Sequence, residues 1–306
     1  MSFDPNSPVR RTPLMTLADK PHLACKMEAC QTSGSFKMRG AIRTLQKLAQ
    51  EGDKRQVITV SMGNTAFSLA WAGRLLNRKV CVVMPENVSP AKLELTRKIG
   101  AQVILHGQTG SAAMAHCEKL VAKGNYYFLH PHKCPPFLAG SESIGQELME
   151  DQPGMRRIYV PVGGGGLLSA MCSFACQSTR PIEIVGVEAE GAPAFARSLA
   201  AGKPVSISRI DTIADALTIN EPDAEVFAYV AAHIDTILTV NEEEIVGSMR
   251  MLFDEFRIIA EPGGAAPLAA MIKNDNGEIA AAIISGGNIS MESFSRITSV
   301  QDQTRQ

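Results

Sequence analysis

The chain has 306 residues, of which 45% are hydrophobic and 20% are charged, and its formal net charge is −1 at pH 7. This is the composition of a globular protein with one or two domains, and so small a net charge gives no general attraction for nucleic acid or for an anionic membrane. We therefore expect chemistry on a small molecule, with neither nucleic acid nor membrane as partner.

The seven cysteines are odd in number and scattered, without the spacing of a metal site. They indicate reduced thiols and a cytoplasmic protein. The first residues, MSFDPNSPVRRTPL, lack the apolar core of a signal peptide. No apolar stretch reaches the roughly 18 residues that a membrane span needs, so we expect a soluble protein.

From residue 53 onward, short β-branched runs alternate with helical stretches. In chain order these are VITV (57–60), a helix at 65–76, KVCVVMP (79–85), a helix at 89–100, AQVIL (101–105), a further helix and YYFL (126–129). This alternation predicts a parallel sheet covered by helices. The ends of the helix at 89–100 are the best marked, with Ser89 as N-cap, Pro90 in the first turn and Gly100 at the end.

A second series of the same kind follows. It comprises RRIYVPV (156–162), a helix, IEIVGVE (182–188), TILTV (236–240), a long helix from Asn241 and IAAAIIS (279–285). The two series predict two α/β lobes, with HPHKCPPFLAG (130–140) as the crossing between them. We predict a small mobile domain over 53–132 and a large cofactor-binding domain formed by 1–52 together with 133–306, which includes the helix after Lys37.

Three predicted strands end in turns of small residues, where open parallel sheets bind their ligands. These turns are SMGNT (61–65), GGGG (163–166) and SGGN (285–288). The four glycines lead into a helix at Leu167, which favours a main-chain cradle for a phosphate, although a plain tight turn is an equal interpretation of the glycines alone. A dinucleotide site is disfavoured, because the third glycine of its fingerprint is replaced by Leu168.

Lys37 lies in TSGSFKMRGA (32–41), just before a helical pattern. The simplest interpretation is a solvated helix start. A lysine in a partly apolar pocket can also form a Schiff base, and a phosphate cradle elsewhere in the chain suggests an aldehyde that carries a phosphate. Pyridoxal phosphate fits both features, and Ser285 could meet its pyridine nitrogen.

Seven motifs occur in the order of a known family. They are SFKMRGA, SxGN, VPVGGGGLLSA, VGVE, TIAD, EPGGAA and SGGN. By these motifs the chain resembles, over essentially its whole length, the fold-type II pyridoxal-phosphate enzymes of the serine/threonine dehydratase and serine racemase group. The resemblance implies an α/β, two-lobed, open parallel-sheet fold of the tryptophan-synthase-β type, and a homodimer.

The resemblance also implies roles for individual residues. Lys37 is the Schiff-base lysine and the base that removes the Cα proton, Phe36 packs against the cofactor ring, and Asn64 bonds the phenolic oxygen. The phosphate is held by Gly163, Gly164, Gly165, Gly166 and Leu167, and Ser285 meets the pyridine nitrogen. The substrate carboxylate is clamped by the turn of Ser61, Met62, Gly63, Asn64 and Thr65. Purely structural roles for Phe36, Asn64 and Ser285 stay open.

Departures from the family pattern carry information about the reaction. Met62 stands where racemases have a serine, and a thioether cannot transfer protons. Thr65, as in cysteine synthases, replaces the histidine usual in dehydratases, and Phe67 and Ser68 replace a Gln-Gly pair. A bulky Phe67 and an added carboxylate, Glu142, imply a substrate other than plain serine or threonine, unless Glu142 is a solvent-exposed acid at a helix start.

Two further departures concern a metal and regulation. Relatives that bind a divalent metal use the glutamate of VGVE, a carbonyl and a second acid; here Glu188 and Ala192 match, but the acid is replaced by Ala194, and we assign no metal. The chain stops soon after SGGN, so we do not expect the regulatory domain of biosynthetic threonine deaminases.

We therefore expect a pyridoxal-phosphate-dependent ammonia-lyase that eliminates the β-substituent of a β-hydroxy or otherwise β-substituted amino acid and yields a keto acid and ammonia. The alternative is a β-replacement synthase of the cysteine-synthase kind, which Thr65 favours. A racemase and a non-catalytic ligand-binding protein on the same fold are weaker alternatives.

Overall fold

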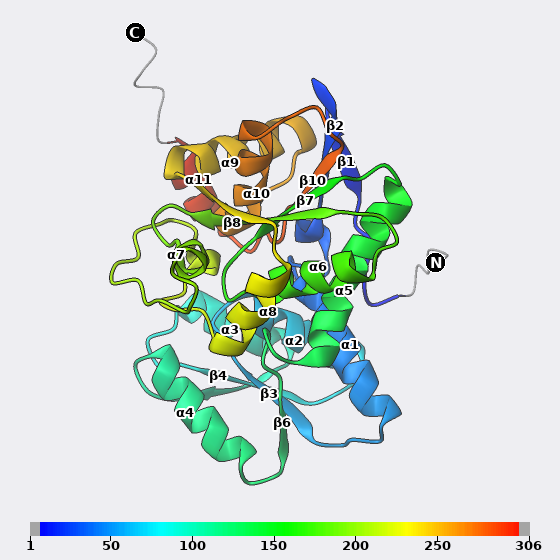
Figure 1. The fold of residues 1–306 in the computed structure, drawn as a ribbon. Helices are drawn as coiled ribbons and strands as arrows, with labels where there is room; N and C mark the ends of the chain where they lie inside the picture. The colour runs from blue at the N-terminus through cyan, green and yellow to red at the C-terminus, as the bar shows by residue number, and fades with distance from the viewer. Residues whose placement is uncertain (1–6, 300–306) are drawn as a thin grey trace. The chain divides into compact units, whose positions relative to one another are not determined.

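The computed structural model of the protein describes residues 7–299. Residues 1–6, which begin the segment searched for a signal peptide, and residues 300–306 lie outside this range. The chain folds as two compact units, which we call the four-stranded unit (residues 7–11 and 31–143) and the six-stranded unit (residues 12–30 and 144–299). Figure 1 shows the course of the chain through both.

The sheet of the four-stranded unit is parallel throughout, in the order β5-β4-β3-β6. Its strands are β3 (Gln56–Val60), β4 (Val80–Met84), β5 (Gln102–Leu105) and β6 (Tyr126–Phe128). Its helices are α1 (Lys37–Gln50), α2 (Asn64–Leu75), α3 (Pro90–Ile99) and α4 (Gly110–Val121), and α5 (Pro135–Asp151) begins in this unit and ends in the other.

Alternate side chains of β3 and β4 enter two different apolar cores. Val57, Val80 and Val82 pack with residues of α1 and α2, whereas Ile58 and Cys81 pack with residues of α4. Successive side chains of a strand point to opposite faces, so a sheet covered on both sides needs apolar residues at every position. This is why VCVVM is an unbroken apolar run and VITV has one polar residue, Thr59, whose buried hydroxyl donates to Leu129 O at 2.9 Å.

The ends of α3 are as the sequence predicts. Ser89 is the N-cap residue, Pro90 is the first helical residue, and Gly100 ends the helix with φ +126°, which favours glycine. Ser89 forms no side-chain capping hydrogen bond, so it contributes to the helix start only through its non-helical backbone conformation.

The six-stranded unit has the strand order β1-β2-β10-β7-β8-β9, in which only the β1–β2 pair is antiparallel. Its strands are β1 (Leu14–Leu17), β2 (Lys20–Lys26), β7 (Arg157–Pro161), β8 (Glu183–Ala189), β9 (Thr236–Val240) and β10 (Ala280–Ile283). Its helices are η1 (Glu28–Cys30), α6 (Gly166–Gln177), α7 (Ala194–Ala201), η2 (Asp215–Leu217), α8 (Ala224–His233), α9 (Glu242–Phe256), α10 (Pro262–Lys273) and α11 (Met291–Ser299).

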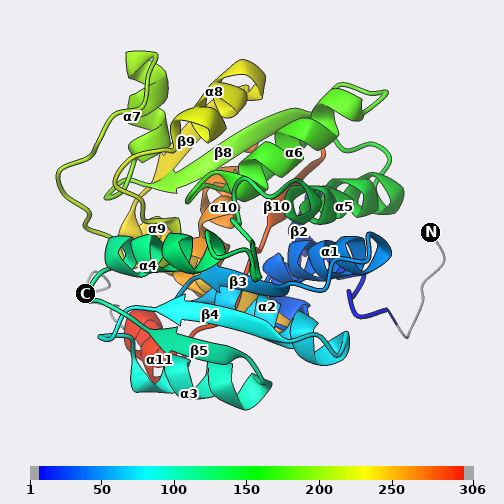
Figure 2. The ribbon, with the colours of Figure 1, turned by 90° about the horizontal axis from the view of Figure 1, so that it is seen from below.

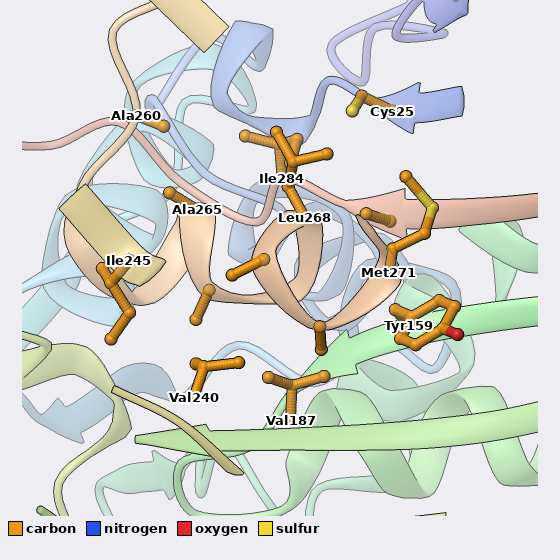
Figure 3. Close-up of a cluster of buried hydrophobic side chains, with 14 of the residues drawn as sticks. Cys25, Tyr159, Val187, Val240, Ile245, Ala260, Ala265, Leu268, Met271 and Ile284 are labelled. Carbon is orange, nitrogen blue, oxygen red and sulfur yellow. The ribbon is translucent and has the colours of Figure 1, made fainter. Parts of the chain in front are cut away.

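Both faces of this sheet are covered. Helices α9 and α10 lie on one side (Figure 1), and α6 and α8 lie on the other, where Figure 2 shows them beside β8. On the first side, Tyr159, Val187 and Val240 of three strands face Leu268 and Met271 of α10 (Figure 3). This cluster is the main core of the unit.

The structure confirms the predicted fold class and places every predicted strand within two residues of its predicted bounds. The β1–β2 hairpin and the helices α7, α8, α10 and α11 were not predicted. The predicted domain ranges differ from the grouping by contacts, which assigns α1 and residues 133–143 to the four-stranded unit. Because those ranges describe which segments move together, they stay a prediction.

Within residues 7–299, the helices are too short or too polar to cross a lipid bilayer.

Candidate active site

Lys37 is the first residue of α1, and its surroundings in the four-stranded unit are tightly packed. Its side chain is half-buried, and its Nζ lies 4.5 Å from the centre of the Phe36 ring, which is itself buried. A Cβ on Gly40 would come within 2.5 Å of the Phe137 ring, and a Cβ on Gly140 within 2.5 Å of the Arg39 carbonyl oxygen. The two glycines therefore allow α5 to approach the start of α1 closely, which holds Lys37 in place.

The turn from Ser61 to Thr65 connects β3 to α2. Gly63 is the N-cap of α2, its N–H donates to Ser61 Oγ at 3.2 Å, and Asn64 is the first helical residue. Met62 is 42% exposed, whereas Thr65 is buried. The first N–H groups of a helix have no intrahelical acceptor, and together with the helix dipole they favour an anion such as a carboxylate.

Three buried hydroxyls join these two segments. Ser68, in the second turn of α2, lies 2.8 Å from Ser33 Oγ and 3.4 Å from Ser35 Oγ, and Ser35 directly precedes Phe36. The structure thus brings the Lys37 segment and the Ser61–Thr65 turn into one hydrogen-bonded arrangement. From the sequence, Ser68 is predicted only as a departure from the family pattern. Its position between Phe67 and Leu69 in an apolar stretch is the signal that it is buried.

In the six-stranded unit, the four glycines form the loop between β7 and α6. Gly165 is the N-cap of α6 with φ +83°, and a Cβ there would lie 2.7 Å from both Phe195 Cζ and Val226 Cγ1. A Cβ on Gly163 would lie 2.6 Å from the Ala216 carbonyl oxygen. Only glycine fits these two positions, so the main chain of the loop can come close to a ligand.

This loop fits a phosphate group. Gly164 and Gly166 complete it, Leu167 is buried, and α6 directs its N-terminus at the loop. One turn further, Ser169 Oγ is buried without a hydrogen-bond partner among the described residues. A buried hydroxyl in the first turns of such a helix is consistent with a polar ligand at the loop.

Ser285 follows β10 and is buried, with 7% of its surface exposed. Its neighbours are firmly held, since Ala29 N–H donates to Ile284 O at 2.9 Å and Glu261 N–H donates to Gly286 O at 3.0 Å. Strands β10 and β7 are adjacent and parallel, so Ser285 and the glycine loop follow neighbouring strand ends. In the six-stranded unit they lie at the edge of the sheet where open parallel sheets bind their ligands.

Glu188, at the end of β8, has both carboxylate oxygens engaged. Phe195 N–H donates to Oε1 at 2.9 Å and Ala196 N–H donates to Oε2 at 2.8 Å, at the start of α7. Burial raises the pKa of this carboxyl to about 7, although the amide hydrogen bonds act in the opposite direction. In residues 7–299 no three His, Cys, Asp or Glu side chains are placed to hold a metal ion.

The structure changes the interpretation of two residues that depart from the family pattern. Phe67 is buried in the apolar core shared with α1, so its bulk carries no information about the substrate. Glu142 is half-buried and lies well inside α5, so the idea of an exposed acid at a helix start is wrong.

Comparison with known proteins agrees with the motifs. A family model described as pyridoxal-phosphate dependent enzyme matches residues 6–286. The L-threonine ammonia-lyase of Thermotoga maritima is 36% identical over 275 residues, covering 89% of this chain and 68% of that protein. The catabolic L-threonine dehydratase of Staphylococcus aureus is 33% identical over 302 residues, covering 94% and 87%.

A solved structure, the processed form of threonine deaminase isoform 2 from Solanum lycopersicum, has a TM-score of 0.88 at 30% identity and covers 96% of this chain and 89% of that one. The predicted family, cofactor and class of reaction are confirmed. The chain belongs to the pyridoxal-phosphate-dependent enzyme family and is a pyridoxal-phosphate-dependent lyase.

Proposed function

We propose that the chain is an ammonia-lyase for a β-hydroxy amino acid, with L-threonine and L-serine as the first substrates to test. The names of its relatives support this substrate class. The observation that carries the proposal is the packing of Lys37 at the start of α1, where Phe36 and the close approach of α5 hold a half-buried ammonium.

Lys37 has two tasks in this proposal. Its Nζ would hold the cofactor covalently, and as a free amine it would remove the Cα proton of the substrate. The bound cofactor supplies the electron sink that makes this proton acidic enough to remove. Phe36 limits the motion of the lysine side chain, and its buried ring keeps water from one side of the ammonium.

The remaining residues hold the cofactor and the substrate. Gly163 to Gly166 and Leu167 would bind the phosphate through main-chain N–H groups, Ser285 the pyridine nitrogen, and Asn64 the phenolic oxygen. The turn of Ser61, Met62, Gly63, Asn64 and Thr65 would bind the substrate carboxylate at the N-terminus of α2, which orients the Cα–H bond toward the base.

A β-replacement synthase is the second candidate, because the turn ends in Gly-Asn-Thr as in cysteine synthases, and Thr65 is buried at the start of α2. Met62 argues against a racemase, since a thioether has no proton to transfer. We further propose a cytoplasmic homodimer. The family resemblance supports the dimer. The seven cysteines, none of which forms a disulfide within residues 7–299, support a reducing compartment.

The test of this proposal starts with the covalent link. Borohydride reduction of the purified protein followed by peptide mapping should place the pyridoxyl group on Lys37. The variant Lys37→Ala should lose it, while Lys47→Ala, an exposed lysine of the same helix, should keep it. Ammonia and keto acid release from threonine and serine, with and without an added thiol, then distinguishes elimination from replacement. Labelling of another residue would refute the role of Lys37.

A further inference from the structure

Glu188 is a fully buried carboxylate that the proposed reaction does not use. It is the second-last residue of β8, which pairs with β7, and the chain continues from β7 into the glycine loop. In the six-stranded unit its two oxygens accept hydrogen bonds from the first turn of α7, at 2.9 Å from Phe195 N and 2.8 Å from Ala196 N. A side chain that accepts two main-chain amides fixes the helix start in both position and direction.

The helix start that Glu188 holds carries the side chain that contacts the glycine loop. Phe195 is fully buried, and the tip of its ring occupies the space that a side chain on Gly165 would need. Val226 of α8 occupies the same space from another direction. Gly165 is the left-handed N-cap of α6, so the position of the Phe195 ring limits where this glycine, and the N–H groups next to it, can lie.

The chemistry at this position is specific to a carboxylate. Both oxygens are acceptors, whereas a glutamine at the same position has one acceptor and one NH₂ group, which would face a main-chain N–H. Burial disfavours the charge and the α7 dipole favours it. Replacing Glu188 by glutamine therefore removes one of the two anchors of α7 with almost no change in side-chain volume.

We propose that Glu188 is a positioning residue for the glycine loop, acting through the start of α7 and the Phe195 ring to set the affinity of the loop for a phosphate group. This inference rests on the proposed role of Gly163 to Gly166 as the phosphate site. Loss of this positioning should weaken binding of the phosphate but not binding of the ring or the aldehyde of the cofactor. A general loss of stability would weaken binding of all three parts.

The experiment compares Glu188→Gln with Glu190→Gln, which makes the same chemical change at an exposed glutamate two residues further on. Binding of pyridoxal phosphate and of pyridoxal to the cofactor-free proteins is measured by fluorescence titration. We expect Glu188→Gln to weaken pyridoxal phosphate binding about tenfold, the equivalent of one hydrogen bond, and to change pyridoxal binding less than about twofold. Glu190→Gln should behave as wild type in both titrations.

A second measurement uses inorganic phosphate as the ligand and does not depend on Lys37. It should raise the melting temperature of wild type and of Glu190→Gln more than that of Glu188→Gln. If Glu188→Gln does not fold, Phe195→Leu, which removes the ring but stays apolar, should show the same selective loss for the phosphorylated ligand.

Two results would overturn the proposal: an equal loss of affinity for pyridoxal phosphate and pyridoxal, or no loss for either. Absence of a pyridoxyl group on Lys37 would instead refute the proposed function. The melting temperatures with inorganic phosphate would still test the role of Glu188.

Discussion

The hydroxyl oxygens of Ser33 and Ser68 lie 2.8 Å apart in the buried interior of the four-stranded unit. Ser33 precedes Lys37 by four residues, and Ser68 follows Asn64 by four, so one hydrogen bond joins the segment of the proposed base to the helix that begins at the proposed carboxylate site. Two residues on different elements thus set the spacing of two functional segments.

This relationship predicts energetic coupling. Ser33→Ala and Ser68→Ala should each lower the free energy of unfolding by about 1–2 kcal/mol, because each removes the 2.8 Å hydrogen bond between two buried hydroxyls. The double variant should be less destabilised than the sum, by about 1 kcal/mol. Urea unfolding of the three variants measures this. Ser141→Ala, whose hydroxyl donates within its own helix to Phe137 O, is the control and should show no coupling to Ser33→Ala. Additive effects of Ser33 and Ser68 would contradict the inferred link.

Glu188 should make stability depend on pH. Its pKa in the folded protein is raised to about 7, above the value near 4.5 of a free glutamate, so the folded state binds a proton more tightly than the unfolded state. The resulting stabilisation is complete below pH 4.5 and is lost as the pH rises to 7, at up to about 1.4 kcal/mol per pH unit.

The measurement is the free energy of unfolding of wild type and Glu188→Gln across about pH 4 to 9. Only the difference between the two curves reports on Glu188, since other groups titrate in both proteins. We expect the difference to change between pH 4.5 and 7 and to be flat above about pH 8. A difference that does not change with pH would show that the carboxyl has an ordinary pKa.

Gly165→Ala should be more damaging than a left-handed glycine elsewhere. Gly165 and Gly202 have φ of +83° and +67°, so alanine costs about 1–2 kcal/mol of backbone strain at either site. Only at Gly165 would the new methyl also meet Phe195 and Val226 at 2.7 Å, while nothing lies within 4 Å at Gly202. Urea unfolding and cofactor titration of both variants test this. If Gly165→Ala and Gly202→Ala had equal effects, the glycine loop would be able to shift and accommodate the new methyl group.

Lys26 should be a strong determinant of stability. Its side chain is fully buried, and its Nζ lies 2.7 Å from Glu147 Oε2 and donates to Thr12 O at 2.8 Å. Lys26→Met should destabilise the protein by about 3–5 kcal/mol, because it removes the buried ammonium from the carboxylates of Glu147 and Asp151. The control is Lys20→Met on the same strand, whose ion pair is partly exposed and whose loss should cost far less. Thermal unfolding of both variants measures the two losses of stability. Comparable losses for Lys26→Met and Lys20→Met would contradict the prediction.

The parts of the fold that were predicted depend on short-range patterns. The apolar runs of β3 and β4, the proline and glycine at the ends of α3, and the four glycines before α6 each reflect a local requirement of backbone or burial. The β1–β2 hairpin was missed because lysine and histidine interrupt its apolar pattern, and α10 was missed because two glycines and Pro267 lower its helix propensity. Close packing requires one of those glycines: a Cβ on Gly264 would lie 2.4 Å from Gly286 O.

The sequence by itself determined the two parallel-sheet series and the family, since these follow from spacing and residue type along the chain, and it predicts the residues that would carry the chemistry. Only the tertiary structure decided what each residue contacts. Phe67 is in the core, Ser68 bonds Ser33, and Glu188 holds the start of α7. Contacts of this kind join elements that are distant or differently oriented, and burial, which sets their strength, is a property of the packed molecule.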